Sequence, residues 1–255
     1  MPPADSIDVP RLLADCKLAS VEYRGSLPST QDRAHQLAAD GKTPLLVVAD
    51  AQTAGRGRGG NRWWTGGGSL AFSLLIDPVA HGLPRQPVSQ ASLAAGIALI
   101  DAVSVWLGDT IIGLHWPNDV FAAGRKLAGI LIDVLPDGRH IVGVGLNVNN
   151  TFSAAPDEVR LRATSLIELS GQTLDRTEIL ILFLRAFEGM LAQLATNPAE
   201  LGCRFDRCCL QIGHDLTIEL ANRRTTGRCA GIAPDGALLL DTLSGRQKFY
   251  SGVLR

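Results

Sequence analysis

The chain has 255 residues, of which 46% are hydrophobic and 19% charged. This balance suits a packed globular core and excludes a disordered chain, and the formal net charge of −1 excludes a global attraction to nucleic acid or to an anionic membrane. The longest unbroken apolar runs, such as residues 70–76 and 96–100, are far shorter than a membrane span, and residues 1–10 lack the core of a signal peptide. We therefore expect a cytoplasmic protein.

The first predicted elements are two strands with a long loop between them. Apolar runs at residues 45–49 and 70–76 predict the strands, and a glycine-rich stretch between them predicts the loop. Apolar side chains then recur at helical spacing over residues 87–107. This spacing predicts a helix that packs on the core, with Ser89 as its N-cap.

Three further apolar runs predict strands in the middle of the chain. They cover residues 111–116, 127–135 and 141–148. Together with the two earlier runs they predict a mixed sheet of about five strands. Asp175 and Glu178 resemble a capping box at the start of a helix over residues 179–194, which Asn197 and Pro198 end.

Short apolar runs separated by turns predict a small barrel at the C-terminal end. The runs cover residues 216–220, 225–232, 237–241 and 247–254. We therefore expect an α+β protein, with a mixed sheet packed with helices over residues 1–209 and an SH3-like β-barrel over residues 210–255. A barrel of this size is too small to be an enzyme by itself.

The cysteines and histidines form no catalytic or metal-binding pattern. Five cysteines, Cys16, Cys203, Cys208, Cys209 and Cys229, are an odd number without CxxC spacing, which disfavours a disulfide framework and a zinc site. We expect them to be reduced structural residues. The histidines are scattered singly and no GxSxG or HExxH pattern occurs. We therefore expect any catalysis to depend on charge placement rather than on a protein nucleophile.

Residues 55–64, the Gly/Arg loop, form the most distinctive motif, because glycines alternate with arginines there. Glycine lets successive backbone N–H groups line a concave anion site, and each arginine offers a planar fork for a carboxylate or a phosphate. A flexible basic linker, of the kind found in nucleic-acid-binding segments, is the alternative. Because the stretch is short and flanked by apolar runs, we expect a loop between two strands that binds an anion.

Further polar motifs accompany the Gly/Arg loop. They are Ser29-Thr30-Gln31 with Gln52, Trp116-Pro117-Asn118-Asp119 followed by Arg125-Lys126, and Gly143-Val144-Gly145 followed by Asn147. Glycines inside a strand indicate close approach by a ligand or by another backbone. Each motif alone is weak, but in this order and at these distances they resemble the biotin protein ligase family over most of the chain.

The resemblance implies a reaction in two steps. Biotin and ATP give biotinyl-5′-AMP and pyrophosphate, and the biotinyl group then passes to a lysine of the biotin carboxyl carrier domain of acetyl-CoA carboxylase or a related carboxylase. Magnesium is expected because pyrophosphate is the leaving group, with ligands that the sequence does not assign. The resemblance is to the short form of the family, since only residues 1–28 precede Ser29 and leave no room for a helix-turn-helix. A homodimer is left open, and no nucleic acid or membrane partner is expected.

The resemblance also implies site residues. A carboxylate that attacks an α-phosphate brings two anions together, so cations are needed, and Lys126, Arg56 and Arg58 are the implied catalytic residues. Those implied to bind biotin are Ser29, Thr30, Gln31, Gln52, Arg56, Gly57, Arg58 and Lys126. Those implied to bind the nucleotide are Gly55, Arg56, Arg58, Asn118, Asp119 and Asn147. Ser29 also suits a helix N-cap, and Asn118 with Asp119 also suits a simple turn.

Two positions depart from the family pattern. Gln31 stands where asparagine is usual and adds a methylene, and His115 stands where lysine is frequent, which removes or weakens one cation near neutral pH. Trp63 and Trp64 either flank the biotin pocket or anchor the loop in the core, and we favour anchoring. The barrel either completes the ATP or acceptor surface or only stabilises the protein.

Three other functions are weighed against the ligase. A lipoyl or octanoyl transferase shares the expected fold, but the Gly/Arg loop and the C-terminal barrel are features of the biotin branch. A non-catalytic biotin or adenylate sensor is motivated by Gln31 and His115 and disfavoured by the retention of Arg56, Arg58 and Lys126. A nucleic-acid-binding module is disfavoured by the balanced charge and the aromatic content of 5%.

Overall fold

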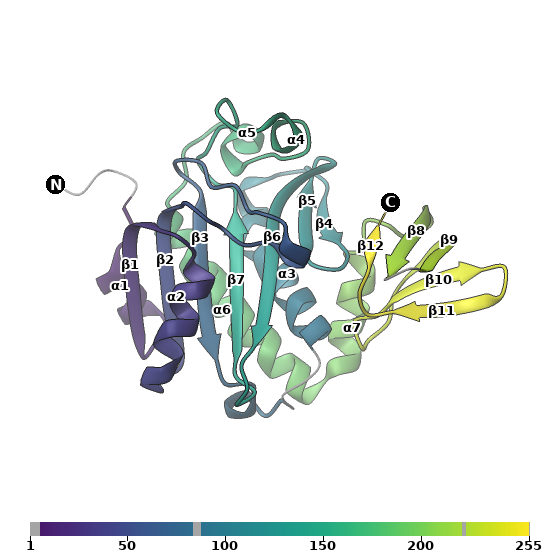
Figure 1. The fold of residues 1–255 in the computed structure, drawn as a ribbon, viewed down its shortest axis with the longest axis horizontal. Coiled ribbons are helices and arrows are strands. Elements are labelled where there is room, and N and C mark those ends of the chain that lie inside the picture. Colours follow the sequence, from purple (N-terminus) through teal and green to yellow (C-terminus); the bar gives the residue numbers. More distant parts are fainter. Residues whose placement is uncertain (1–5, 84–87, 221–222, 255) are drawn as a thin grey trace.

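The computed structural model describes residues 6–83, 88–220 and 223–254. Figure 1 shows a large sheet with helices packed against it and, beside it, a smaller β-rich domain formed by the C-terminal part of the chain. The predicted α+β class, with a mixed sheet and a small C-terminal β-domain, is confirmed.

The large sheet is mixed and has seven strands in the order β1-β2-β3-β7-β6-β5-β4. Its strands are β1 (Ser20–Leu27), β2 (Leu45–Gln52), β3 (Leu70–Ile76), β4 (Ile112–His115), β5 (Asp119–Ala122), β6 (Arg125–Val134) and β7 (His140–Leu146). Only β1 and β2 pair in parallel; the other neighbours are antiparallel. The five predicted strands are all present, whereas β1 and β5 were missed because β1 is a partly exposed edge strand and β5 begins inside the polar turn.

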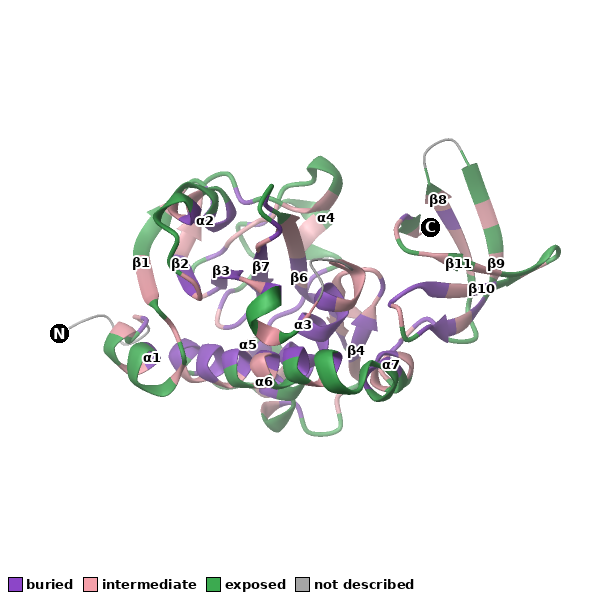
Figure 2. Ribbon diagram, turned by 90° about the horizontal axis from the view of Figure 1, so that it is seen from below, coloured by how far each residue is buried: buried purple, intermediate pink, exposed green. Residues whose placement is uncertain are grey.

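Helices cover both faces of this sheet, as Figure 2 shows. The helices are α1 (Val9–Asp15), α2 (Thr30–Leu37), α3 (Val88–Val103), α4 (Asp157–Arg160), α5 (Leu166–Ser170), α6 (Arg176–Thr196) and α7 (Pro198–Arg207). Alternate residues of β2 serve the two faces: Leu46 and Val48 join the main core with α3 and α6, whereas Leu45 and Val47 join a second cluster with α2. A strand buried on both faces reads as a continuous apolar run, which is why β2 could be predicted.

The ends of the long helices are partly as predicted. Asp175 caps α6 by accepting hydrogen bonds from the backbone N–H groups of Thr177 and Glu178. Asn197 ends α6 but also caps α7, which Pro198 begins in the position where proline suits a helix. The prediction of Ser89 as an N-cap was wrong, because Ser89 lies inside α3; the predicted first residue of that helix, Pro87, lies outside the described residues.

Two segments are long and apolar enough to cross a membrane by length and composition alone. They are Val88–Trp106, which contains α3, and α6. Core helices of globular proteins pass the same test, and here 67% and 50% of the two apolar windows are buried inside the fold. Phe183 of α6 packs edge-on against Phe72 of β3, with 5.1 Å between the ring centroids. The two segments therefore serve as core helices of this fold.

The C-terminal strands form an antiparallel sheet in the order β11-β10-β9-β8-β12. They are β8 (Asp215–Leu220), β9 (Arg223–Ile232), β10 (Leu238–Thr242), β11 (Gly245–Phe249) and β12 (Val253–Leu254). The predicted run over residues 247–254 is divided into β11 and β12. Within the part of the chain that the structure describes, the ladder is open between these two strands.

The small domain is joined to the large sheet by several contacts. The connecting chain pairs with the edge strand β4, since Leu114 donates its N–H to the Cys208 carbonyl and accepts from the N–H of Leu210. Ser89 and Gln90 of α3 donate to the carbonyls of Asp235 and Pro234. These contacts hold the small domain next to the end of β4.

Candidate active site

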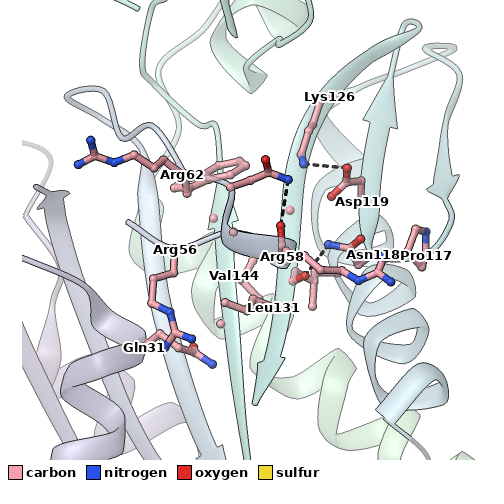
Figure 3. A pocket seen from close by; sticks show the side chains of 18 of the residues that line it. Gln31, Arg56, Arg58, Arg62, Pro117, Asn118, Asp119, Lys126, Leu131 and Val144 are labelled. Carbon is pink, nitrogen blue, oxygen red and sulfur yellow. Dashed lines mark hydrogen bonds and ion pairs between the residues drawn. The ribbon is translucent and has the colours of Figure 1, made fainter. Parts of the chain in front are cut away.

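A cavity of about 860 Å³ lies over β3, β7 and β6 and reaches the small domain. Most of the residues predicted from the sequence line it: Ser29, Thr30, Gln31, Gln52, Arg56, Gly57, Arg58, Asn118, Asp119 and Lys126. Figure 3 shows Gln31 and Arg56 on one side of this cavity and the Lys126–Asp119 pair on the other. The fold therefore brings together side chains that lie nearly one hundred residues apart in the sequence.

One end of the cavity is polar and uncharged. Ser29 caps α2 by accepting from the N–H of Asp32, so this hydroxyl has the helix role that the sequence also allowed. Gln52 Oε1 accepts from the backbone N–H of Thr30 at 2.8 Å and from its hydroxyl at 3.2 Å. The hydroxyl of Ser73, on β3, lies 2.9 Å from both the Thr30 hydroxyl and Gln31 Oε1. This network fixes several donors and acceptors at the base of the cavity.

The longer side chain of Gln31 has a definite place. Its Nε2 donates to the Ile141 carbonyl at 3.1 Å, and the residue is only 3% exposed. Gly143 leaves the room for it, because a Cβ at that position would overlap Gln31 Oε1. The extra methylene therefore carries the amide to the backbone of β7.

Trp63 forms a wall of the cavity. A Cβ on Gly145 would overlap its indole, so the glycines of β7 admit two side chains, Gln31 and Trp63, rather than a second backbone. The indole Nε1 of Trp63 is buried and, within the described residues, has no hydrogen-bond partner. Trp64 instead packs on Phe152, with 5.9 Å between the ring centroids. The preference for anchoring therefore suits Trp64, whereas Trp63 lies at the cavity itself.

Lys126 and Asp119 form the ionic centre of the cavity. Lys126 Nζ lies 2.7 Å from Asp119 Oδ2 and 5.6 Å from the centroid of the Trp63 ring. The lysine backbone is held on its other side by the segment before α5, since it donates to the Arg162 carbonyl and accepts from the N–H of Thr164. Asp119 Oδ1 is buried and has no hydrogen-bond partner among the described residues. An orphaned carboxylate oxygen beside a lysine is a site where a ligand or cation can bind.

The turn at residues 116–119 is tied to β6. Asn118 Nδ2 donates to the Ile130 carbonyl and the Asn118 carbonyl accepts from the N–H of Ile130, both at 2.8 Å. The turn is therefore more than a simple connection, because it fixes where Asp119 begins β5.

The two arginines of the loop have different surroundings. Arg56 Nη1 lies 2.9 Å from Asp32 Oδ1 and 3.3 Å from Asp133 Oδ2, so two carboxylates already balance its charge. Arg58 donates to the Gly252 carbonyl of the small domain at 3.1 Å. Burial lowers the pKa of the Arg58 guanidinium, and the nearby Asp119 opposes that shift; the group stays charged because arginine titrates far above neutral pH.

His115 stacks on Phe121, with 4.3 Å between the ring centroids, and lines the cavity. Burial lowers its pKa below the ordinary value of 6.5, which the charge of Asp119 partly opposes and that of Lys126 reinforces. The imidazole is therefore neutral at neutral pH and supplies no cation to the site.

Two predicted residues do not line the cavity. Gly55 lies at the base of the Gly/Arg loop, where its carbonyl accepts from the N–H of Trp63, and a Cβ would lie 2.6 Å from the Trp63 carbonyl. Asn147 is 3% exposed and accepts from Asn150 Nδ2 at 3.2 Å. Gly55 therefore contacts the base of the loop, and Asn147 is buried outside the cavity lining.

Several lining residues were not predicted. Arg62 and Arg162 add cations, and Glu219, Leu220, Gly252, Val253 and Leu254 come from the small domain. Arg62 extends away from the Lys126–Asp119 pair in Figure 3. The residues of the small domain carry no sequence signal, because only tertiary packing places their backbone at the cavity.

No metal cluster is preformed in the described part of the chain. Groups of three or more His, Cys, Asp or Glu side chains that could hold an ion are not found there. The five cysteines are free thiols in this structure. A divalent cation at this site would therefore depend on a ligand to complete its coordination.

Comparison with known proteins gives consistent matches. A model of the "Biotin/lipoate A/B protein ligase family" matches residues 23–149, and a model of the "Biotin protein ligase C terminal domain" matches residues 212–253. The chain is 34% identical to the bifunctional ligase/repressor BirA of Bacillus subtilis over 90% of this chain and 71% of that one. It is 36% identical to the biotin--[acetyl-CoA-carboxylase] ligase of Mycobacterium tuberculosis over 77% of this chain and 73% of that one.

The fold agrees with these sequence matches. The structure of the biotin protein ligase of Aquifex aeolicus in complex with biotin and ATP superposes with a TM-score of 0.82 at 29% identity, covering 93% of this chain and 99% of that one. Both domains of the chain match, and the cavity lies in the matched region. The chain therefore belongs to the biotin protein ligase family.

Proposed function

We propose that the protein is an ATP-dependent biotin protein ligase, which activates biotin as biotinyl-5′-AMP and transfers it to a lysine of a biotin carboxyl carrier domain. The observation that carries this proposal is one cavity with uncharged polar side chains at one end and the Lys126 ammonium at its centre. A substrate with a polar, uncharged head and a carboxylate at the other end matches that division. The Aquifex relative is a biotin protein ligase in complex with biotin and ATP.

The polar end of the cavity suits the ureido ring of biotin. Ser29, Thr30, Gln31 and Gln52 lie there, and a buried ureido group needs hydrogen-bond partners for its carbonyl and its two N–H groups. The indole ring of Trp63 lines the same cavity and adds an apolar wall beside these polar groups. This arrangement supports the assignment of these residues to biotin.

Lys126 is placed for the first chemical step. A carboxylate oxygen of biotin attacks the α-phosphorus of ATP, the bond to the β-phosphate oxygen breaks, and pyrophosphate leaves. Two anions meet in that step, and the Lys126 ammonium reduces their repulsion while Arg58 adds a second positive charge. Arg56 lines the same cavity and is assigned to the biotin carboxylate and the phosphates, and its pairs with Asp32 and Asp133 hold it beside the site.

The second step uses the same centre. The neutral amine of the acceptor lysine attacks the acyl carbon, the bond from that carbon to the AMP phosphate oxygen breaks, and AMP leaves with the bonding electrons. The nitrogen releases one proton to solvent as the amide forms. Lys126 and Arg58 again balance the charge of the leaving group. Gly57 and Arg58 belong to a glycine-rich loop that closes over a reactive mixed anhydride and protects it from water.

Asn118 and Asp119 belong to the nucleotide side, with magnesium. Mg²⁺ usually takes one or two protein carboxylates and completes its shell with phosphates and water, and the orphaned Asp119 Oδ1 fits that need. A bound Mg²⁺ would neutralise part of the charge of the phosphates. The family resemblance assigns Gly55 and Asn147 to the nucleotide as well, although neither lines the cavity in this structure.

The acceptor is a biotin carboxyl carrier protein or domain, as the named activity of the Mycobacterium relative on acetyl-CoA carboxylase suggests. The reaction that we propose involves no nucleic acid and no membrane. We place the catalytic domain at residues 1–209, the SH3-like domain at residues 210–255, and the protein in the cytoplasm.

Pyrophosphate release tests this proposal. The purified protein is incubated with Mg-ATP and either biotin or lipoate, and the bound product is identified by mass spectrometry under non-denaturing conditions. Biotin-dependent release with retained biotinyl-5′-AMP is the expected result. A preference for lipoate assigns the protein to the sister branch of the family, and biotin binding without pyrophosphate release assigns it to a sensor.

A further inference from the structure

The connection between α7 and β8 makes an unusual contact with the active-site turn. Gln211 Oε1 accepts from the backbone N–H of Trp116 at 3.1 Å, and Gln211 Nε2 donates to the Trp116 carbonyl at 3.3 Å. Both residues are buried, with Gln211 4% and Trp116 1% exposed. One side-chain amide thus satisfies both backbone groups of one residue.

This contact continues a strand ladder. Leu114 donates to the Cys208 carbonyl and accepts from the N–H of Leu210, so the connection lies parallel to β4. At the next rung the side-chain amide of Gln211 takes the place of a peptide group. The ladder therefore extends beyond the end of β4, into the turn where a regular strand no longer pairs.

The small domain holds Trp116 a second time. The indole Nε1 of Trp116 donates to the carbonyl of Gly236 at 3.1 Å. Trp116 is thus fixed through its backbone by Gln211 and through its ring by the turn between β9 and β10.

Trp116 begins the turn that leads to Asp119 of the ionic centre. Asn118 is tied to Ile130, and Asp119, paired with His115 in the sheet, holds Lys126 at 2.7 Å. A shift of Trp116 would move Asp119 and change its distance from Lys126. Reaction rates depend steeply on such positions, since a displacement of about 1 Å costs roughly 100-fold.

We propose that Gln211 is a positioning residue for adenylate formation: it clamps the backbone of Trp116 and thereby sets the Asp119–Lys126 pair. The proposal rests on the ligase function proposed above. Gln211 itself does not line the cavity, so it acts through the turn and not on a substrate.

The test uses Gln211→Met, which keeps the length of the side chain and removes both hydrogen bonds. Gln211→Asn is the second variant, because its shorter amide keeps a polar group but cannot span both atoms of Trp116. Gln90→Met is the matched control: it removes another glutamine amide that donates across the same domain contact, to Pro234. Biotin affinity, kcat and KM for ATP in pyrophosphate release, and thermal stability are measured for each full-length protein.

The expected result is a fall in kcat/KM for ATP of roughly 10- to 100-fold in Gln211→Met, with biotin affinity within about twofold of wild type, because the polar base of the cavity is a separate network. If Gln211→Met does not fold, Gln211→Asn decides by the same criterion. Unchanged adenylation, or equal losses in biotin binding and adenylation, overturns the positioning role. A wild type without biotin-dependent pyrophosphate release overturns the ligase function itself, and with it the clamp.

Discussion

At the scale of single residues, three cations of the predicted site lie in one cavity, each with its own partners. Lys126 lies against Asp119 and over Trp63, Arg58 reaches the small domain, and Arg56 is balanced by two carboxylates. The three cations of the predicted site therefore have three different surroundings. Each can be tested by removing one charge.

Lys126→Ala removes the cation at which the two anions meet. We expect adenylate formation to fall by roughly 100- to 1,000-fold, while the fold is kept because the side chain is partly exposed. Biotin-dependent pyrophosphate release measures the effect. Lys17→Ala is the control, since it breaks an exposed lysine–carboxylate pair with Glu188 outside the cavity. Unaltered release in Lys126→Ala refutes its catalytic role.

Arg58→Gly removes the contact between the Gly/Arg loop and Gly252. We expect the variant to release its adenylate and to label lysines of unrelated proteins, because the loop no longer holds the intermediate. Stray biotinylation of a bystander protein is measured by mass spectrometry. Arg58→Ala is the control, since it removes the same side chain without the added backbone freedom of glycine. Labelling confined to the carrier domain in Arg58→Gly argues against the retaining role.

His115 predicts a pH dependence of stability. Its pKa is lower in the folded protein than its ordinary value of 6.5, so the unfolded chain binds more protons as the pH falls through 6.5 toward the folded-state value. The contribution of the neutral His115 imidazole to the free energy of unfolding is fully present above pH 6.5 and is lost as the pH falls below 6.5 toward the folded-state pKa. The free energy of unfolding in urea should therefore fall less between about pH 7.5 and about pH 5.5 in His115→Gln than in the wild type. Equal slopes contradict the burial of a neutral imidazole.

At the scale of elements, sequence patterns predict the buried strands that read as continuous apolar runs and the helices whose apolar residues recur at helical spacing. The strands β2, β3 and β7 and the helices α3 and α6 are such elements, and all of them were predicted. In contrast, β1 and β5 were missed because an edge strand and a strand that starts in a polar turn lack a continuous apolar run. The division of the last run into β11 and β12 follows from tertiary pairing, which no local pattern records.

The same distinction holds for the site. Sequence motifs predicted Lys126, Asp119 and the polar residues at one end of the cavity, because the order and spacing of these motifs resemble the family. The structure places these residues on the lining of one cavity. The anchoring of Arg56 by Asp32 and Asp133 depends on contacts between distant segments. The inward position of Trp63 likewise depends on the glycines of β7.

Glycines in two elements give a matched prediction. Gly145→Ala on β7 places a Cβ against the indole of Trp63, whereas Gly189→Ala on the exposed side of α6 meets no atom within 4 Å. We expect the first to cost about 1–3 kcal/mol and to impair adenylation, and the second to stabilise the protein by up to about 1 kcal/mol. Urea unfolding and pyrophosphate release measure the two effects. An active, equally stable Gly145→Ala protein contradicts the placement of Trp63.

At the scale of the whole molecule, the two domains share one cavity. The large sheet supplies the polar base and the ionic centre, and the small domain supplies Gly252, Val253 and the contacts to Trp116. The small domain therefore lines the cavity as well as packing on the large sheet, and that it completes the ATP or acceptor surface stays a prediction. Truncation of the small domain cannot isolate its function, because Trp116 of the active-site turn would lose three hydrogen bonds at once.

The most direct test of the ligase activity is transfer to an acceptor. The protein is incubated with biotin, Mg-ATP and a biotin carboxyl carrier domain, and the acceptor is analysed by intact mass and by peptide mapping. We expect one added biotinyl group on a single lysine, dependent on ATP and lost with Lys126→Ala. An acceptor that stays unmodified with the wild type, or is modified equally with Lys126→Ala, would contradict it.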